Sequence, residues 1–167
     1  MSSSLREIVF TEKNNYSYRP ELQIVGFGIL VCLVTWVISD LALFGHKSTA
    51  IFDIWTLTHI AAGAVLSYGT ILMRRVDLHH PIMFLLLLSF GWEIVEHYVE
   101  ISNIAYLSKW FAGEENLINR LVSDQIAVVV GFFIIKWRPR LFPIAVLIAG
   151  GILGIHILLG DSMYFFK

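Results

Sequence analysis

The sequence contains a single cysteine, Cys32, and this residue lies within an apolar run. One cysteine excludes both an intrachain disulfide and a cysteine-rich zinc site, and a small buried apolar residue is its simplest interpretation. Charged residues are also scarce, at 15% of the chain against 57% hydrophobic residues. Because a soluble domain carries about 25% charged residues, the composition predicts a membrane domain. The net charge of −1 gives no reason to expect nucleic acid as a partner.

Several familiar signatures are missing from the chain. The first 20 residues are polar and mixed in charge, without a short apolar core or a small-residue cleavage site, which argues against a cleaved signal peptide. There is no HExxH sequence, no serine-triad signature and no phosphatase signature. The chain also has no internal repeat and no low-complexity tract. The common motifs therefore do not assign an enzyme class.

Apolar segments are the most prominent feature that the chain does have. A spanning helix needs about 20 mostly apolar residues, and five segments reach or approach this length. Pro81 and Pro143 fit the first turn of a helix, where a missing N–H costs nothing. The predicted fold is all-α, a polytopic bundle of five transmembrane helices in one domain over residues 22–167, preceded by a tail over residues 1–21. The helices are expected at residues 22–44, 54–73, 81–101, 121–137 and 141–160.

Lys and Arg are distributed unevenly over the expected connections, and this distribution sets the orientation of a membrane protein. The N-terminal tail and the connections after the second and fourth helices carry eight of these residues, and the opposite side carries four. The bias predicts a cytoplasmic N-terminus and a C-terminus outside. The first helix is then expected to act as the insertion signal.

The connection over residues 102–120 is the only long one that the pattern predicts. Apolar residues recur in it at helical spacing, with Lys109, Glu114 and Glu115 outside that stripe. A short helix lying in the outer interface of the membrane would produce this pattern. An ordered loop fits it equally well, so both interpretations stay open. The apolar residues are Ile104, Leu107, Trp110 and Phe111.

The most informative segment is the end of the third helix, where ionisable residues follow a strongly apolar run. Glu93, Glu96, His97 and Glu100 have the spacing i, i+3, i+4, i+7, so on a helix they share a face. Ionisable groups inside a membrane are expensive and are usually paired, protonated or bound to an ion. Two close carboxyl groups do not both stay ionised without a cation or a shared proton. The stripe therefore predicts a polar site inside the membrane.

Other polar residues are expected at the same level, because successive helices run in opposite directions. His59 lies one to two turns below the outer surface on the second helix, and Asp124 lies near the outer end of the fourth helix. A site open to the outer side follows from this convergence. Further residues placed towards that side are Asp40, His46, Asp53, Asn119, Ser123, His156 and Asp161.

A divalent metal ion would neutralise this cluster, since metal sites in helix bundles use Glu and His from facing helices. Mixed His and carboxylate ligands suit zinc, manganese or iron better than calcium. We assign His59, Glu93 and Asp124 as metal ligands, and Glu96 and His97 as catalytic candidates. Glu96 would act as a general acid/base, and His97 is an alternative ligand. Hydrogen bonds between protonated or neutral side chains of neighbouring helices are the competing, purely structural interpretation.

Three short motifs also carry a resemblance to known proteins. Their order resembles that in the VanZ-like and YjdF-like families of small bacterial inner-membrane proteins, over about residues 54–137. The resemblance implies a location in the bacterial inner membrane, and it carries over the four ionisable residues of the motifs as the site. The motifs are His59-x-x-x-Gly63, Glu93-x-x-Glu96 and Asp124-x6-Gly131.

The chain departs from the VanZ-like pattern at two positions. Val128 stands where VanZ-like members commonly have Asn, and Glu96 stands where they often have Gln. The second difference fits the YjdF-like pattern better. Some VanZ-like members are associated with glycopeptide-antibiotic resistance, but these departures give no basis for transferring that role to this chain.

Two classes of function are open at this point. The first is a membrane-embedded, metal-dependent enzyme that acts on a lipid or lipid-linked substrate from the outer leaflet. The second is a non-enzymatic subunit or binding protein of a larger membrane complex or a homo-oligomer, whose acids anchor helices, bind a cofactor or couple to a proton. A proton or ion carrier is a weaker third class, because the helices show no interrupted pairs or repeated halves. Membrane lipids are expected partners in every case.

Overall fold

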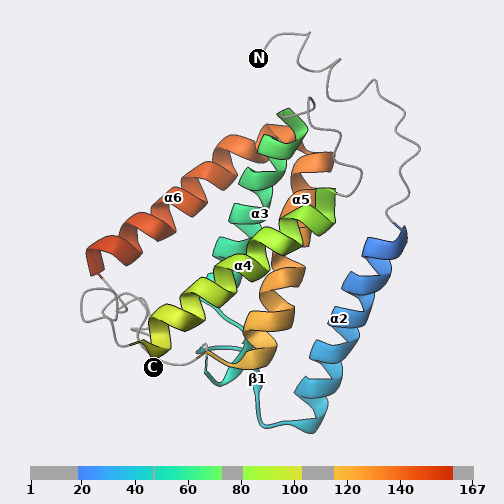
Figure 1. Cartoon of the computed structure of the whole chain (residues 1–167), viewed down its shortest axis with the longest axis vertical. Coiled ribbons are helices and arrows are strands. Elements are labelled where there is room, and N and C mark those ends of the chain that lie inside the picture. The colour runs from blue at the N-terminus through green and yellow to red at the C-terminus, as the bar shows by residue number, and fades with distance from the viewer. Residues whose placement is uncertain (1–18, 47, 73–80, 103–114, 160–167) are drawn as a thin grey trace.

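The computed structural model describes residues 19–46, 48–72, 81–102 and 115–159 of the chain. Helices make up most of these residues, which confirms the predicted all-α class. Figure 1 shows that the long helices form a bundle in which successive helices run in opposite directions. They are α2 (Arg19–Ile38), α3 (Ile54–Leu72), α4 (Pro81–Ile101), α5 (Asp124–Trp137) and α6 (Phe142–Leu159). A π-helical segment, η1 (Asn119–Ser123), leads into α5, and a short 3-10 helix, η2 (Pro139–Leu141), precedes α6.

The second to fifth predicted helices agree with α3 to α6 within three residues at each end. The first predicted helix, residues 22–44, is wrong at its end because α2 stops at Ile38. The hydroxyl group of Ser39 donates a hydrogen bond of 2.6 Å to the carbonyl of Thr35 and accepts one of 3.3 Å from the N–H of Leu41. Such local bonds compete with the helical ladder and favour a helix end.

Two short strands occupy the connection after α2, and the sequence pattern did not indicate them. β1 (Ala42–Phe44) pairs in parallel with β2 (Ala50–Phe52), with Ala42 opposite Ala50 and Phe44 opposite Phe52. Ala50 and Ile51 are fully buried. The sheet therefore ties this connection to the end of the bundle at which α3 begins.

Asp53 fixes the start of α3 directly after β2. Its carboxylate accepts hydrogen bonds from the backbone N–H groups of Trp55 at 2.8 Å and Thr56 at 3.1 Å. The Thr56 hydroxyl in turn accepts the backbone N–H of Asp53 at 3.1 Å. These reciprocal bonds satisfy N–H groups that a helix start leaves open. They set the first turn of α3, and with it the position of His59 on the next turn.

The centre of the bundle is the contact between α3 and α5, where two glycines allow the backbones to touch. A Cβ atom on Gly63 would lie 2.2 Å from the carbonyl oxygen of Val128, and one on Gly131 would lie 2.1 Å from that of Ile60. Only glycine therefore fits at either position without moving a helix. The apolar core on the other side of α5 includes Ile82 and other side chains of α4.

Three helices among the described residues are long and apolar enough to cross a membrane by length and composition: α2, α4 and the helix over residues 139–158. The prediction of five spanning helices is thus supported for these three only. The helix α5 has 14 residues, fewer than the about 20 that a straight span needs. The helix α3 is central in the bundle and carries several polar residues, including His59 and Ser67.

The distribution of side chains is the reverse of that in a water-soluble bundle. Only 11% of the apolar window is buried in α2 and in the helix over residues 139–158. Large apolar side chains point outward, such as Phe27, Leu147 and Leu158, which are 68%, 73% and 83% exposed. Among the described residues, 11 polar or charged side chains are buried beside 14 apolar ones. Large exposed apolar surfaces mark contacts with lipid or protein.

Two sequence predictions fall outside the described residues. The apolar stripe expected in the long connection, Ile104, Leu107, Trp110 and Phe111, lies there, and so does Asp161. The choice between an interfacial helix and a loop therefore stays open.

Candidate metal centre

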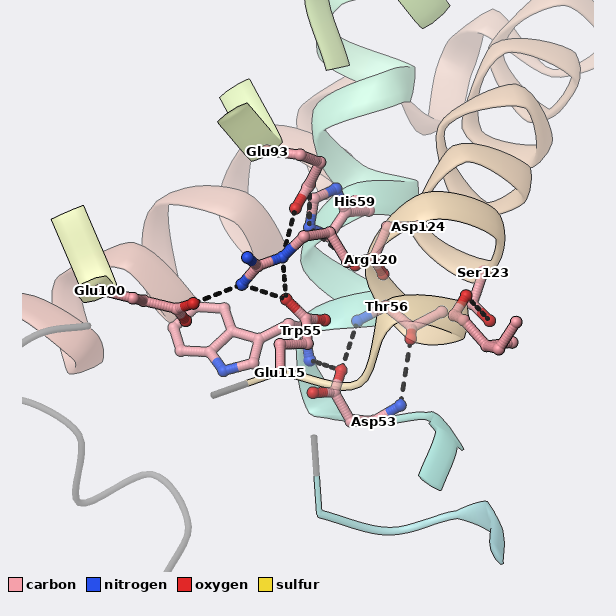
Figure 2. A network of polar contacts seen from close by, with 11 residues as sticks. Asp53, Trp55, Thr56, His59, Glu93, Glu100, Glu115, Arg120, Ser123 and Asp124 are labelled. Carbon is pink, nitrogen blue, oxygen red and sulfur yellow. Dashed lines mark hydrogen bonds and ion pairs between the residues drawn. The ribbon is translucent and has the colours of Figure 1, made fainter. Parts of the chain in front are cut away.

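Three of the predicted site residues meet at one point, each from a different helix. His59 comes from α3, Glu93 from α4 and Asp124 from the start of α5 (Figure 2). The Nε2 atom of His59 lies 3.6 Å from Oε1 of Glu93 and 3.6 Å from Oδ2 of Asp124. The three potential ligand atoms all lie within 4.8 Å of one another. The side chains of Glu93 and Asp124 are 2% and 1% exposed.

The local structure of α3 and α5 explains why His59 and Asp124 meet. His59 is one helical turn before Gly63, at the close contact between these two helices. On the α5 side, the backbone N–H of Asp124 bonds to the carbonyl of Asn119, five residues earlier, as in a π-helix. Five-residue bonding widens the turn, and such segments occur frequently at functional sites. In η1 it accompanies a run of buried polar side chains: Asn119, Arg120, Ser123 and Asp124.

Arg120 connects this cluster to two further carboxyl groups. Its Nη2 atom lies 2.5 Å from Oε2 of Glu100 and 3.2 Å from Oε2 of Glu115, and its Nε atom lies 3.7 Å from Oε2 of Glu93. Figure 2 shows the guanidinium group between these three acids. The side chain of Arg120 is 4% exposed. One cation thus holds together α4, the segment before η1 and η1 itself.

The sequence pattern did not indicate Arg120 or Glu115 as site residues, since both were expected in the connection between two spans. One signal was present: Arg120 lies four residues before Asp124, a spacing that places two side chains on the same helix face. Burial and the charge of Glu96 together raise the pKa of Glu115 to about 7, although Arg120 opposes the shift. Both causes favour the neutral form of this carboxyl group.

The charges of the buried cluster do not balance. Three carboxyl groups, those of Glu93, Glu100 and Glu115, contact one guanidinium group, and a fourth, that of Asp124, lies against His59. All four carboxyl oxygens of Glu93 and Asp124 are buried without a hydrogen-bond partner among the described residues. Their contacts with His59 and Arg120 are 3.6 to 3.7 Å long, and buried carboxylate oxygens without a hydrogen bond are costly. A bound cation would satisfy them.

The donors fit a divalent transition metal. Imidazole nitrogen and carboxylate oxygen are both ligand types of zinc and iron, but this set has one histidine and two carboxylates, whereas common catalytic zinc and iron sites have two histidines and one carboxylate. Arg120 lies against Oε2 of Glu93, on the other side of this carboxylate from the Oε1 atom that approaches His59. Contacts of this kind orient a ligand and tune a metal site. We therefore treat His59, Glu93 and Asp124 as the candidate metal centre.

The two catalytic candidates lie differently. Glu96 lines a cavity next to His59, whereas His97 is exposed and belongs neither to the cluster nor to the cavity lining among the described residues. Neighbouring residues of an α-helix point about 100° apart. The predicted stripe is therefore too wide for Glu96 and His97 to face the same site, and the structure brings only Glu96 close to it.

Other polar residues of the predicted outer side divide into two groups. Asn119, Ser123, Asp53 and His156 are buried, and the ring of His156 lies edge-on to that of Trp55 with centroids 4.7 Å apart. In contrast, Asp40 is exposed and His46 is half-buried, where it contacts Ser48. The convergence of polar residues thus holds for part of the predicted set.

A cavity of about 340 Å³ lies beside the candidate metal centre, and we refer to it as the interhelical cavity. His59 belongs to both, since its side chain also forms part of the cavity wall. Volumes of about 300–1,000 Å³ are typical of small-molecule sites. The lining residues are Trp55, Thr58, His59, Ala62 and Leu66 of α3, Leu88, Ser89, Trp92 and Glu96 of α4, Glu115, Val128 of α5, and Leu153 and His156 of α6.

Comparison with protein families, curated proteins and solved structures gives no match for this chain. The VanZ-like and YjdF-like resemblance stays a prediction from the order of three motifs. The structure adds that the first and last of these motifs pair a polar residue with a glycine of the contact between α3 and α5.

Proposed function

We propose that this chain is an integral membrane protein that binds a divalent metal ion at His59, Glu93 and Asp124 and uses it for chemistry on a lipid or lipid-linked substrate. The single observation that carries the proposal is the meeting of two buried carboxylates, Glu93 and Asp124, with the half-buried His59 from three helices. A lone charged carboxylate inside a membrane costs about 2.5–3.5 kcal/mol on insertion scales. Two adjacent ones call for a cation.

The membrane setting is supported by the three apolar helices and their outward-facing apolar side chains. With the orientation expected from Lys and Arg, the centre faces the outer side of the membrane, and by resemblance this is the bacterial inner membrane. The remaining helices α3 and α5 would cross with the others as part of a five-helix domain. Their polar residues are then shielded from lipid by α2, α4 and α6.

The chemistry would follow from the metal and from the acid beside it. A divalent ion held by His59, Glu93 and Asp124 would polarise a carbonyl or phosphoryl oxygen and would lower the pKa of bound water to about 7. Glu96 lines the interhelical cavity together with His59, so it is placed to move a proton to or from a group bound there. Arg120 does not itself line the cavity; it holds Glu93 in position and contacts the cavity wall at Glu115.

A second candidate function is a non-enzymatic subunit of a membrane complex. It is favoured by the open face of α6, where a Cβ atom on Gly150, Gly151 or Gly154 would meet nothing within 4 Å. Small residues allow membrane helices to approach closely. Co-purification with a larger protein in fixed stoichiometry, without bound metal, would favour this function over the enzyme.

Metal analysis of the purified protein tests the first proposal. Wild type, Glu93→Gln and Asp124→Asn are purified in mild detergent, and zinc, manganese and iron are measured per chain. We expect close to one ion per chain in wild type and a large loss in both variants. Asp40→Asn is the matched control, because Asp40 is an exposed acid outside the cluster. Equally low metal in wild type and in all variants would remove the proposal.

A further inference from the structure

The interhelical cavity changes in character along the bundle. On α3, its lining begins with Trp55 and His59 and ends with Leu66, a length of roughly 16 Å at 1.5 Å per residue. The helix α4 runs in the opposite direction (Figure 1). Its acidic residue Glu96 therefore lies towards the Trp55 end and its Leu88 towards the Leu66 end. The cavity thus has an acidic, aromatic end and an apolar end.

We propose that the interhelical cavity binds an amphiphile with a cationic ammonium group at the acidic end and a hydrocarbon chain at the apolar end. This assignment names the substrate class of the proposed function and rests on its membrane setting, but it does not depend on the metal ion.

The charge of the acidic end favours a cation. Glu96 and Glu115 come from different segments and both line the cavity. The guanidinium group of Arg120 contacts Glu115, but it also pairs with Glu93 and Glu100. An ammonium group between the two acids would relieve their repulsion, whereas an anionic group would add to it.

The aromatic walls favour the same ligand. Trp55 and Trp92 both line the cavity, from α3 and α4. The face of a tryptophan ring attracts organic cations, and sites for quaternary ammonium groups commonly combine aromatic rings with carboxylates. A plain metal ion or a sugar would not need the apolar end. A hydrocarbon chain attached to the ammonium group would fill it against Ala62, Leu66 and Leu88.

The cavity has an opening through which a lipid could enter. Trp92 of α4 and Leu153 of α6 line the cavity and are nevertheless 51% and 55% exposed. The cavity therefore opens between these two helices, both of which belong to the segments apolar enough to span a membrane. A chain in the surrounding bilayer would enter sideways, without passing through water.

Binding of matched single-chain probes tests the assignment. Full-length protein in nanodiscs is titrated with dodecyltrimethylammonium, dodecanol or dodecyl phosphate, in EDTA, and binding is followed by calorimetry. We expect the ammonium probe to bind about tenfold more tightly than dodecyl phosphate, and Glu96→Gln to remove most of this preference. Trp92→Leu should weaken the binding of the ammonium probe and leave the binding of dodecanol unchanged. Leu66→Trp fills the apolar end and should weaken the binding of all three probes. Leu147→Trp, on the outer face of α6, should leave the binding of all three unchanged.

The metal content of the same samples, measured before EDTA is added, separates the two proposals. Equal binding of the three probes to a protein that contains metal would overturn the ligand assignment alone. A preference for ammonium that depends on Glu96, in a protein without metal, would support the assignment and remove the metal centre. The assignment would also be overturned if Glu96→Gln and Trp92→Leu both kept the wild-type preference for the ammonium probe over dodecyl phosphate. The ammonium group would then bind elsewhere.

Discussion

The Nε2 atom of His59 and the Oδ2 atom of Asp124 lie 3.6 Å apart, on two helices whose backbones touch one turn further along. The contact between His59 and Asp124 depends on the backbone contact between α3 and α5. Gly63 and Gly131 bring α3 and α5 close enough for the two side chains to meet, and a larger residue at either glycine would separate them. The geometry of the candidate metal centre is thus set by residues that carry no chemistry.

Gly131→Ala should therefore damage the site from a distance. The new methyl group would lie 2.1 Å from the carbonyl oxygen of Ile60, so α3 and α5 must move apart. Overpacking of this kind costs about 1–3 kcal/mol. We expect a lower melting temperature in detergent and a loss of metal. Gly69→Ala is the control, because a Cβ atom at Gly69 meets nothing within 4 Å. Full metal content in Gly131→Ala would contradict the dependence of the site on this contact.

Removal of Arg120 should destabilise the fold more than the loss of a surface charge. Arg120→Gln leaves Glu93, Glu100 and Glu115 buried around an uncharged group, and breaking a buried ion pair from one side costs about 3–5 kcal/mol. The measurement is thermal unfolding in detergent, with Arg140→Gln as control because Arg140 is exposed. An equally small effect of both substitutions would show that the acids around Arg120 are neutral in the folded protein.

Metal removal gives a second measure of the centre. A ligand present at about 100 times its Kd stabilises the folded state by about 2.7 kcal/mol. A chelator should therefore lower the melting temperature of the wild-type protein by several degrees, and re-addition of zinc or manganese should restore it. His59→Ala should melt at the same temperature with and without the chelator. A chelator effect of equal size in His59→Ala would place the ion elsewhere in the chain.

The sequence predicted the parts of this structure that depend on long, regular patterns. Apolar runs marked the helices, Pro81 marked the start of α4, and the alternating direction of the helices placed His59, Glu93 and Asp124 at one level. The three candidate ligands could be named because each is a polar residue in an apolar segment.

The remaining features depend on geometry that a regular pattern does not contain. Apolar residues resume at Leu41 after the polar pair Ser39-Asp40, so the pattern extends the predicted helix to residue 44, whereas α2 ends at Ile38 and a strand follows. Arg120 lies in the π-helical turn Asn119–Ser123, before the apolar span that the pattern places at residues 121–137, so the pattern assigns it to a connection. His97 was included because it belongs to the same broad stripe as Glu93, but it is exposed.

Cysteine labelling distinguishes a chain with five membrane-spanning helices from a chain with three. In a Cys32→Ser background, single cysteines are introduced as Ser48→Cys and Arg75→Cys and labelled in intact cells with a membrane-impermeant maleimide. If all five helices cross, residue 48 lies outside and residue 75 inside, so only Ser48→Cys is labelled before permeabilisation. If only α2, α4 and the helix over residues 139–158 cross, α3 does not span the membrane. Residue 75 then stays outside together with residue 48, and both cysteines are labelled. We expect the first result, because the two arginines at residues 74 and 75 favour the cytoplasmic side, and because burial of His59 and Asp124 between the other helices shields them from lipid.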